Sequence, residues 1–535
     1  MPEDGSSAAM VADEPVVDIH DIQGDILAGF RKDHEQFSFL RIAEPAAARR
    51  GLRGLVPRLS PLADVAAFNS LFRSMRQRRG EIHGTLSVTW AGVAFSATGI
   101  AALVSPEEVE SFEDEPFKLG MAKRSSLLGD PTDASLPGHP ARWLFGGKGT
   151  PVDAVLLVAS DDPNQLEHTG EALLELLTRE GGFELVYVQR CHVRHDARGR
   201  EHFGFRDGIS QPAPRGRLGP GPASFLSPRL VDPADERALR FARPGQPLVW
   251  PGEFVLGLER QAIPPDNDLA PLPPDPPIPA WARNGSYLVI RRLRQDVDAF
   301  AEFTRKAAAE LAQRPGFAGL TAERLAALLV GRWPSGAPLV RAPASDDQEL
   351  GADDFASNDF GYANAHPPTP LRAGVDHPPD RFAAAVADGN GAICPVAAHV
   401  RKVNPRDQGT DIGGPRATLR RFILRRGLPF GGGPDETGDR GLMFACYQAS
   451  IDRQFEFLIQ DWVNQVKKPT GEPGGHDLLI AQAQSRESGR MRRAVLVGSD
   501  GSEATIEADT EWVIPTGGGY FFAPSISAVR DVLSE

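Results

Sequence analysis

The sequence has few cysteines and no basic excess. Its 535 residues include only Cys191, Cys394 and Cys446. An odd and sparse set excludes a disulfide framework and is typical of a protein kept in a reducing compartment. The formal net charge is −13. Because a nucleic-acid-binding surface requires clustered positive charge, we expect no nucleic-acid partner.

Long apolar runs are also missing. The longest weakly polar run, from Trp90 to Val104, is too short and too rich in Gly, Ser and Thr to span a bilayer. The N-terminal residues Met1-Pro2-Glu3-Asp4-Gly5 are acidic and do not resemble the basic and apolar regions of a signal peptide. We therefore expect a cytoplasmic protein without membrane contact.

The length allows more than one globular domain. A chain of 535 residues exceeds the roughly 250–300 residues at which a single core stops growing. Stretches rich in proline and glycine over residues 213–280 and 334–390 predict a long loop and an ordered insertion. We expect a disordered acidic tail over residues 1–17, an N-terminal domain over 18–212, and a C-terminal domain with long insertions over 213–535.

Strand and helix patterns alternate in both domains. In the first, the predicted strands are Phe37–Ile42, Thr85–Phe95, Asp153–Ser160 and Phe183–Val193, and the helices are Pro61–Arg76 and Asn164–Arg179. In the second, the strands are Ser286–Arg292, Ala417–Leu424, Leu442–Gln448 and Tyr520–Phe522, and the helices are Val297–Leu311 and Ile451–Val466. This order predicts an α+β fold with two ferredoxin-like βαββαβ halves and a ligand between them.

One carboxylate stands on a glycine-bounded turn, Gly204-Phe205-Arg206-Asp207-Gly208. A glycine on each side permits strained backbone angles and close approach of a ligand, so Asp207 is a candidate acid or base. Alone the pattern is weak evidence, because a chain of this length and glycine content contains about one such match by chance.

A second cluster surrounds His399 and Arg425. A neutral imidazole in an apolar setting is a good axial ligand for haem iron, although His399 also fits a packed or capping role. Arg401 and Lys402 suit haem propionates or a solvated basic face. Arg425 and Arg426 are adjacent on a strand, so only one of them faces a pocket. An arginine that faces a pocket can stabilise the negative charge that develops as a peroxide splits. An arginine at the surface would instead form an ion pair with a carboxylate.

Two further patterns do not indicate a site. Cys191, His192, His195 and His202 have loosely zinc-like spacing, but Cys191 and His192 face opposite ways on a strand. The triplet Gly431-Gly432-Gly433 is not a phosphate-binding loop, because no Lys-Ser/Thr follows it.

Six ordered motifs resemble those of the dye-decolorizing peroxidases, a haem peroxidase family unrelated in fold to the plant and animal peroxidases. The motifs are Ile22–Leu27, Trp250–Gly257, Asn284–Val289, Cys446–Gln448, Gln454–Phe457 and Pro515–Phe522. The match covers nearly the whole chain, and the length and insertions resemble the larger members of the family.

This resemblance implies two halves of the dimeric α/β barrel type with one haem b per chain between them. The implied activity is reduction of hydrogen peroxide with oxidation of dyes, phenols or similar bulky organic reductants. The alternative is a haem-handling protein that binds haem, delivers it or removes its iron, with little turnover.

The resemblance also implies roles for single residues. Asp207 corresponds to the distal acid–base residue, Arg425 to the distal arginine, and His399 to the proximal iron ligand. Since an aspartate stands where other peroxidases use histidine, we expect an acidic activity optimum.

Other positions complete the implied pocket. Leu442 and Phe444 line its distal side. From its charge beside His399, we also expect Arg401 to contact the haem. Asp477 resembles the carboxylate that hydrogen-bonds the proximal histidine, with Glu456 as a competing candidate.

Overall fold

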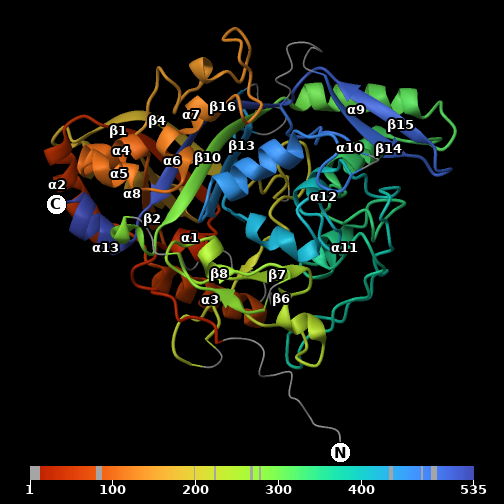
Figure 1. The fold of residues 1–535 in the computed structure, drawn as a ribbon, viewed down its shortest axis with the longest axis horizontal. Coiled ribbons are helices and arrows are strands. Elements are labelled where there is room, and N and C mark those ends of the chain that lie inside the picture. Colours follow the sequence, from red (N-terminus) through yellow and green to blue (C-terminus); the bar gives the residue numbers. More distant parts are fainter. Residues whose placement is uncertain are drawn as a thin grey trace, which may run out of the picture.

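The computed structural model describes residues 13–79, 87–197, 199–221, 224–265, 269–275, 279–432, 438–471, 474–482 and 491–535. Figure 1 shows helices α2 (Pro45–Leu55), α4 (Ala97–Leu103), α5 (Pro106–Glu110) and α8 (Pro163–Thr178) gathered at one end of the molecule. Helices α9 (Val297–Leu311) and α10 (Ala322–Val330) lie at the other end with the hairpin of β14 (Arg492–Val497) and β15 (Glu503–Ala508).

The first half forms one ferredoxin-like unit. Its strands β1 (His34–Ile42), β2 (Trp90–Phe95), β3 (Ala154–Ser160) and β4 (Phe183–His192) lie in the order β4-β1-β3-β2 and pair antiparallel. Between β3 and β4, helix α8 begins at Pro163, where the Asp162 side chain accepts from two backbone N–H groups. Leu166, Gly170, Leu173 and Leu177 form its buried stripe, at the spacing of one helix face.

The second half repeats this arrangement. Strands β10 (Ser286–Gln295), β11 (Leu424–Arg425), β13 (Gly441–Gln448) and β16 (Val513–Ala523) lie in the order β11-β13-β10-β16, and β12 (Leu428–Phe430) also pairs with β13. Phe522 of β16 pairs with Phe95 of β2. Nine of the described strands therefore form one continuous sheet.

The central strands of the sheet are buried on both faces. Phe37, Leu157, Ile290, Met443 and Phe521 belong to the core on one face. Leu156, Val158, Val289, Cys446 and Tyr520 pack in the core on the other face. Because both faces are covered, β3 has the continuous apolar run from which the sequence predicts a buried strand.

Shorter elements complete the chain. The helices are α1 (Gly24–Leu27), α3 (Leu62–Arg79), α6 (Glu115–Leu119), α7 (Met121–Arg124), α11 (Gln348–Ala352), α12 (His399–Val403) and α13 (Ile526–Ala528). The 3₁₀ helices are η2 (Val56–Arg58), η3 (Pro140–Arg142), η4 (Glu236–Leu239), η5 (Pro251–Glu253), η6 (Ala280–Ala282), η7 (Ala356–Asn358) and η8 (Pro415–Arg421). The π-helical segments are η9 (Asp452–Glu456), η10 (Leu458–Val463) and η11 (Val529–Leu533). Small strands are β5 (Ala213–Pro214), β6 (Phe241–Arg243), β7 (Gln246–Val249), β8 (Arg260–Gln261) and β9 (Pro271–Leu272).

The α+β fold with two ferredoxin-like halves is confirmed, with local corrections. The predicted strand Ala417–Leu424 is wrong, because Pro415 begins the 3₁₀ helix η8 and only Leu424 and Arg425 pair with β13. Of the predicted strand Thr85–Phe95, Thr85 and Leu86 lie outside the described residues, and Trp90–Phe95 forms β2.

The predicted tail over residues 1–17 is also wrong in part. Residues 1–12 lie outside the described ranges, but Glu14 is buried and forms ion pairs with Arg215 and Arg229. The domain boundary between residues 212 and 213 stays a prediction.

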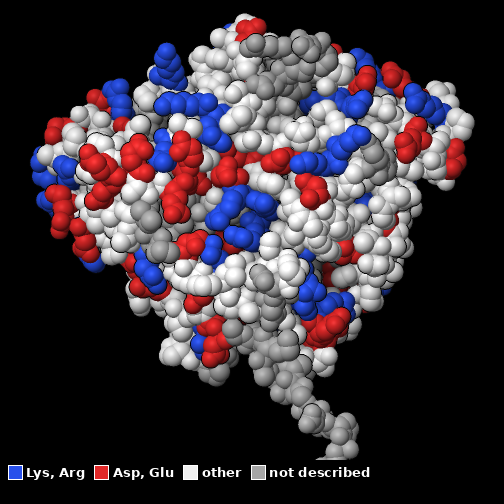
Figure 2. All heavy atoms as spheres, in the orientation of Figure 1, with Lys and Arg blue, Asp and Glu red and all other residues white. Residues whose placement is uncertain are grey.

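Two surface properties bear on partners. Among the described residues, no helix combines the length and hydropathy needed to cross a membrane. Figure 2 shows acidic and basic side chains interspersed over one face, with a basic cluster near its centre.

Candidate active site

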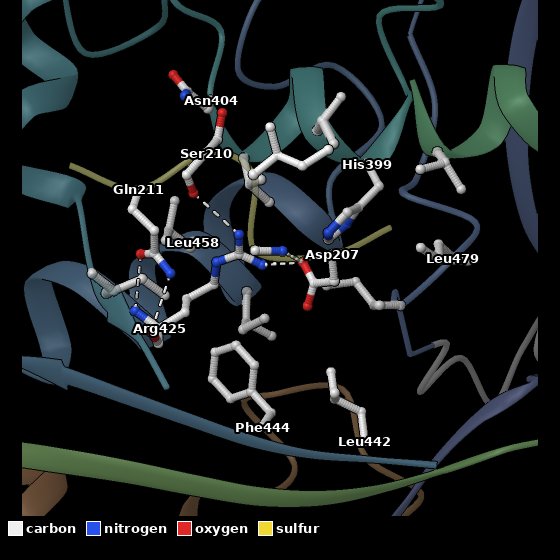
Figure 3. A pocket seen from close by; sticks show the side chains of 18 of the residues that line it. Asp207, Ser210, Gln211, His399, Asn404, Arg425, Leu442, Phe444, Leu458 and Leu479 are labelled. Atoms are coloured by element: carbon white, nitrogen blue, oxygen red, sulfur yellow. Dashed lines mark hydrogen bonds and ion pairs between the residues drawn. The ribbon is translucent and has the colours of Figure 1, made fainter. Parts of the chain in front are cut away.

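A cavity of about 280 Å³ lies over one face of β10 and β13. Alternate residues of these strands line it, among them Leu293, Leu442 and Phe444, as expected for a single strand face. Both predicted domains contribute, since the segment 201–212 and later parts of the chain share the walls. Most lining side chains are apolar, and Figure 3 shows Asp207, His399 and Arg425 meeting among them.

The turn that carries Asp207 depends on its two glycines. Gly204 has φ +93° and Gly208 has φ +77°, which an L side chain rarely adopts. A Cβ at either position would meet nothing within 4 Å, so the requirement is conformational rather than steric. Asp207 Oδ1 accepts from the Gly208 N–H at 2.6 Å and from Arg425 Nη1 at 2.8 Å. These bonds hold the carboxyl at the cavity wall, where its side chain is 44% exposed.

The surroundings of Asp207 keep it ionised. Burial raises the pKa of Asp207, but attraction to Arg425 and the hydrogen bond from the Gly208 N–H together lower it below its ordinary value. Both hydrogen bonds formed with described residues end on Oδ1. Asp207 therefore has an oxygen, Oδ2, that is available to accept a proton in the cavity.

Arg425 and Arg426 point in opposite directions from their strand, as the alternation of β-strand side chains predicts. Arg425 Nη1 reaches Asp207, and its Nη2 donates to Ser210 O at 3.1 Å. The guanidinium of Arg426 instead donates to the carbonyl oxygens of Asp25 and Ile26. Arg425 is thus the cavity-facing arginine.

His399 is the first residue of α12, and its ring is directed into the cavity. Its Nδ1 lies 2.7 Å from Asp477 Oδ2. Asp477 is fully buried, and its Oδ1 accepts from the backbone N–H groups of Leu479 and Ile480. Because a carboxylate accepts at Nδ1, the Nε2 lone pair is available toward the cavity.

The competing carboxylate, Glu456, is occupied elsewhere. Arg124 donates to both of its oxygens, at 2.7 and 2.5 Å, and the Tyr520 hydroxyl donates to Oε1 at 2.8 Å. The structure therefore brings Asp477, and not Glu456, to His399.

The sequence-based placement of Arg401 at the cofactor is wrong. Arg401 does not line the cavity, and its buried guanidinium donates to Asp388 Oδ2 at 3.0 Å. Lys402 is buried too, and its Nζ donates to the carbonyl oxygens of Gln465, Lys468 and Gly475. Both cations therefore stabilise the structure around α12 through these buried hydrogen bonds.

Other arginines, which the sequence did not single out, supply the positive charge of the cavity. They are Arg206, Arg291, Arg332, Arg406 and Arg421. Burial, together with the charge of Arg406, lowers the pKa of Arg332 to about 9. Among the described residues, the buried Nε of Arg421 has no hydrogen-bond partner. Arg332 and Arg406 both lie over the ring of Phe360, and an anion beside them would offset the burial of these two cations.

These features fit a haem. Its iron accepts a neutral imidazole nitrogen, which His399 Nε2 provides. Its flat apolar ring suits walls such as Leu442 and Phe444, and its two carboxylates suit the arginines. The residues with loosely zinc-like spacing lie elsewhere. Cys191 is buried in the sheet core, and His202 Nε2 is hydrogen-bonded to Phe430 O.

Comparisons with known proteins agree with this site. Residues 21–194 match the family model described as the DyP dimeric alpha+beta barrel domain, and residues 345–472 match Dyp-type peroxidase, C-terminal. The chain is 32% identical to a dye-decolorizing peroxidase of Mycetinis scorodonius, over 98% of this chain and 90% of that one. It is similar to the solved structure of an ancestral D-type dye decolorizing peroxidase, with a TM-score of 0.72, 30% identity, and coverage of 97% and 100%. A deferrochelatase of Yersinia pestis is 25% identical over 48% of this chain and 36% of that one.

Proposed function

Because the chain belongs to the dye-decolorizing peroxidase family, and is thus a haem-dependent peroxidase, we propose that Asp207, Arg425 and His399 form its active site. One haem b per chain is the proposed cofactor, with His399 as its iron ligand. Dyes, phenols or similar bulky compounds are the proposed reductants. The predicted cytoplasmic location remains a prediction.

When bound, the haem would supply the iron at which hydrogen peroxide is reduced, and would hold the two oxidising equivalents of the peroxide until reductants consume them. The residues of the chain manage the proton and the charge. Asp207, ionised at neutral pH, would take a proton at Oδ2 from one oxygen of the peroxide and return it to the other oxygen, which leaves as water.

Arg425 has two tasks in this proposal. Its guanidinium keeps Asp207 ionised, and it donates to the oxygen on which negative charge develops as the O–O bond breaks. The dominantly apolar walls strengthen both interactions by excluding water.

Asp477 acts through His399. By accepting from Nδ1, it fixes the tautomer and ring orientation of His399 and raises the basicity of Nε2. Arg332 and Arg406, which line the cavity and both lie over the Phe360 ring, suit the haem carboxylates.

The observation that carries the proposal is the 2.8 Å contact between Asp207 Oδ1 and Arg425 Nη1 in the same cavity as His399. Haem handling alone requires only His399, whereas peroxide cleavage requires the pair. The partial similarity to a deferrochelatase keeps haem handling as the alternative.

The test is rapid mixing of the haem-loaded protein with one equivalent of hydrogen peroxide, following the Soret band. We expect fast loss and red-shift of the band in the wild type. Asp207→Ala and Arg425→Leu should each slow this change at least about a hundredfold. Glu180→Ala, which removes an exposed ion pair with Arg50, is the matched control and should react normally. An unchanged Soret band in the wild type would favour haem handling.

A further inference from the structure

Arg425 lies on an edge strand of only two residues. The next residue, Arg426, donates its backbone N–H to Ala445 O of β13 at 2.7 Å. Successive peptide groups of a strand point to opposite edges, so the N–H and C=O of Arg425 face away from β13. At that edge β11 has no neighbouring strand among the described residues. The backbone that carries the cavity-facing arginine thus needs other partners.

The side chain of Gln211 takes the place of the missing strand. Its Oε1 accepts from the Arg425 N–H at 3.2 Å, and its Nε2 donates to Arg425 O at 3.1 Å. Figure 3 shows the carboxamide lying against this backbone, with one donor and one acceptor matched to one residue. A primary amide has the same pair of groups as the peptide of an adjacent strand.

Gln211 belongs to the segment that also holds the other end of Arg425. Asp207 Oδ1 accepts from Nη1 at 2.8 Å, and Ser210 O accepts from Nη2 at 3.1 Å. One five-residue segment thus contacts both the backbone and the guanidinium of the same arginine. A change at the backbone end is transmitted to the contact with Asp207, because both ends are fixed to one loop.

We propose that Gln211 is a positioning residue, whose carboxamide sets the geometry of the Asp207–Arg425 pair by clamping the backbone of Arg425. This inference rests on the proposed roles of Asp207 and Arg425. Gln211 acts through Arg425 and holds it at the distance where its guanidinium meets both the carboxylate and the reacting oxygen.

The two bonds of the clamp differ in importance. Arg425 O also accepts from Arg426 Nη1 at 3.0 Å, so it keeps a partner without Gln211. Among the described residues, the Arg425 N–H has only Gln211 Oε1 as acceptor. Methionine at 211 would keep the length of the side chain but lose this acceptor. Asparagine would keep the amide but is one methylene shorter.

The chain contains a matched control. Gln23 forms the same paired clamp on one backbone residue, since Oε1 accepts from the Val93 N–H and Nε2 donates to Val93 O, each at 2.9 Å. Gln23 does not line the cavity. Gln23→Met therefore removes the same type of interaction without touching the Asp207–Arg425 pair.

The experiment compares Gln211→Met, Gln23→Met and Arg425→Leu as ferric haem-loaded proteins. Two quantities are measured: the rate constant for the reaction with hydrogen peroxide, and the dissociation constant of fluoride, an anion that binds ferric haem and accepts hydrogen bonds from a distal donor. We expect Gln211→Met to weaken fluoride binding and slow the peroxide reaction by between about tenfold and a hundredfold. Gln23→Met should change neither.

The double variant Gln211→Met/Arg425→Leu tests whether the effect passes through Arg425. It should match Arg425→Leu alone, because the clamp then has no guanidinium to position. A further loss in the double variant, or a Gln211→Met protein as active as Gln23→Met, would overturn the inference. If Gln211→Met does not fold or retain haem, Gln211→Asn provides the same comparison. If Arg425→Leu has the peroxide rate constant and the fluoride dissociation constant of the wild type, the proposed role of Arg425 itself is refuted.

Discussion

Replacing Asp477 by asparagine should weaken haem retention, although the two side chains have nearly the same shape. Asp477 accepts hydrogen bonds on both oxygens, from His399 Nδ1 on Oδ2 and from the N–H groups of Leu479 and Ile480 on Oδ1. Asparagine has one acceptor oxygen, and its NH₂ group must face a donor on one side or the other. Asp477→Asn therefore leaves either the imidazole or the backbone without its acceptor.

The size of the effect follows from the burial of this contact. Asp477 is fully buried, so water cannot replace the lost acceptor. An unsatisfied buried donor costs about 1–3 kcal/mol, which corresponds to roughly 5- to 150-fold in an equilibrium constant. Loss of the outer partner of a metal-bound histidine typically costs about 10–100-fold in metal affinity. We therefore expect haem to dissociate from Asp477→Asn about 10–100-fold faster.

The assay follows haem transfer from the loaded protein to an excess of a haem-scavenging globin. Glu456→Gln is the matched control, because Glu456 is an equally buried carboxyl whose partners are Arg124 and Tyr520. It should lower the free energy of unfolding without accelerating haem release. Wild-type haem release from Asp477→Asn, or equal acceleration in Glu456→Gln, would refute the reasoning.

Two further predictions concern Asp207 and Arg401. Burial raises the pKa of Asp207, but Arg425 and the Gly208 N–H lower this pKa by more. Asp207 should therefore stay ionised, and peroxide reduction should continue, as the pH falls toward the lowered pKa, below which both are lost. Arg425→Leu should move this acid loss to higher pH, which steady-state pH profiles measure; a profile that does not move would contradict the ion pair as its cause. Arg401→Ala should lower the free energy of unfolding by about 3–5 kcal/mol, because it leaves the buried Asp388 carboxylate without its cation. Urea titration checks this value, and peroxide reduction per bound haem should stay at the wild-type level.

Much of the fold could be predicted because the signals are local. The continuous apolar run at β3 and the buried stripe of α8 follow from a period that a strand or helix imposes on its own residues. The error over residues 417–424 has a local cause as well. Leu419 and Phe422 resemble the apolar positions of a strand, but the backbone turns in a 3₁₀ helix that begins at Pro415.

The site required more than local pattern. The Asp207 turn was visible from its glycines, but its pairing with Arg425 joins residues 218 positions apart. Asp477 and Glu456 could not be distinguished from the sequence, because only the tertiary structure shows which carboxyl reaches His399. The misplacement of Arg401 was avoidable. A helix turns about 100° per residue, so a side chain two positions after His399 points away from the cavity.

The position of β16 in the sheet has a consequence for synthesis of the protein. This late strand is the strand of the second ferredoxin-like unit that adjoins the first, since it pairs with β10 and, at Phe522, with β2. Its residues Val513 and Pro515 form part of the cavity wall. As the chain leaves the ribosome, the first unit can assemble early, but the cavity has no complete wall until residue 515 has emerged. The cavity can therefore enclose haem only after β16 has been synthesised. A ribosome-bound nascent chain stalled before β16 has an incomplete cavity.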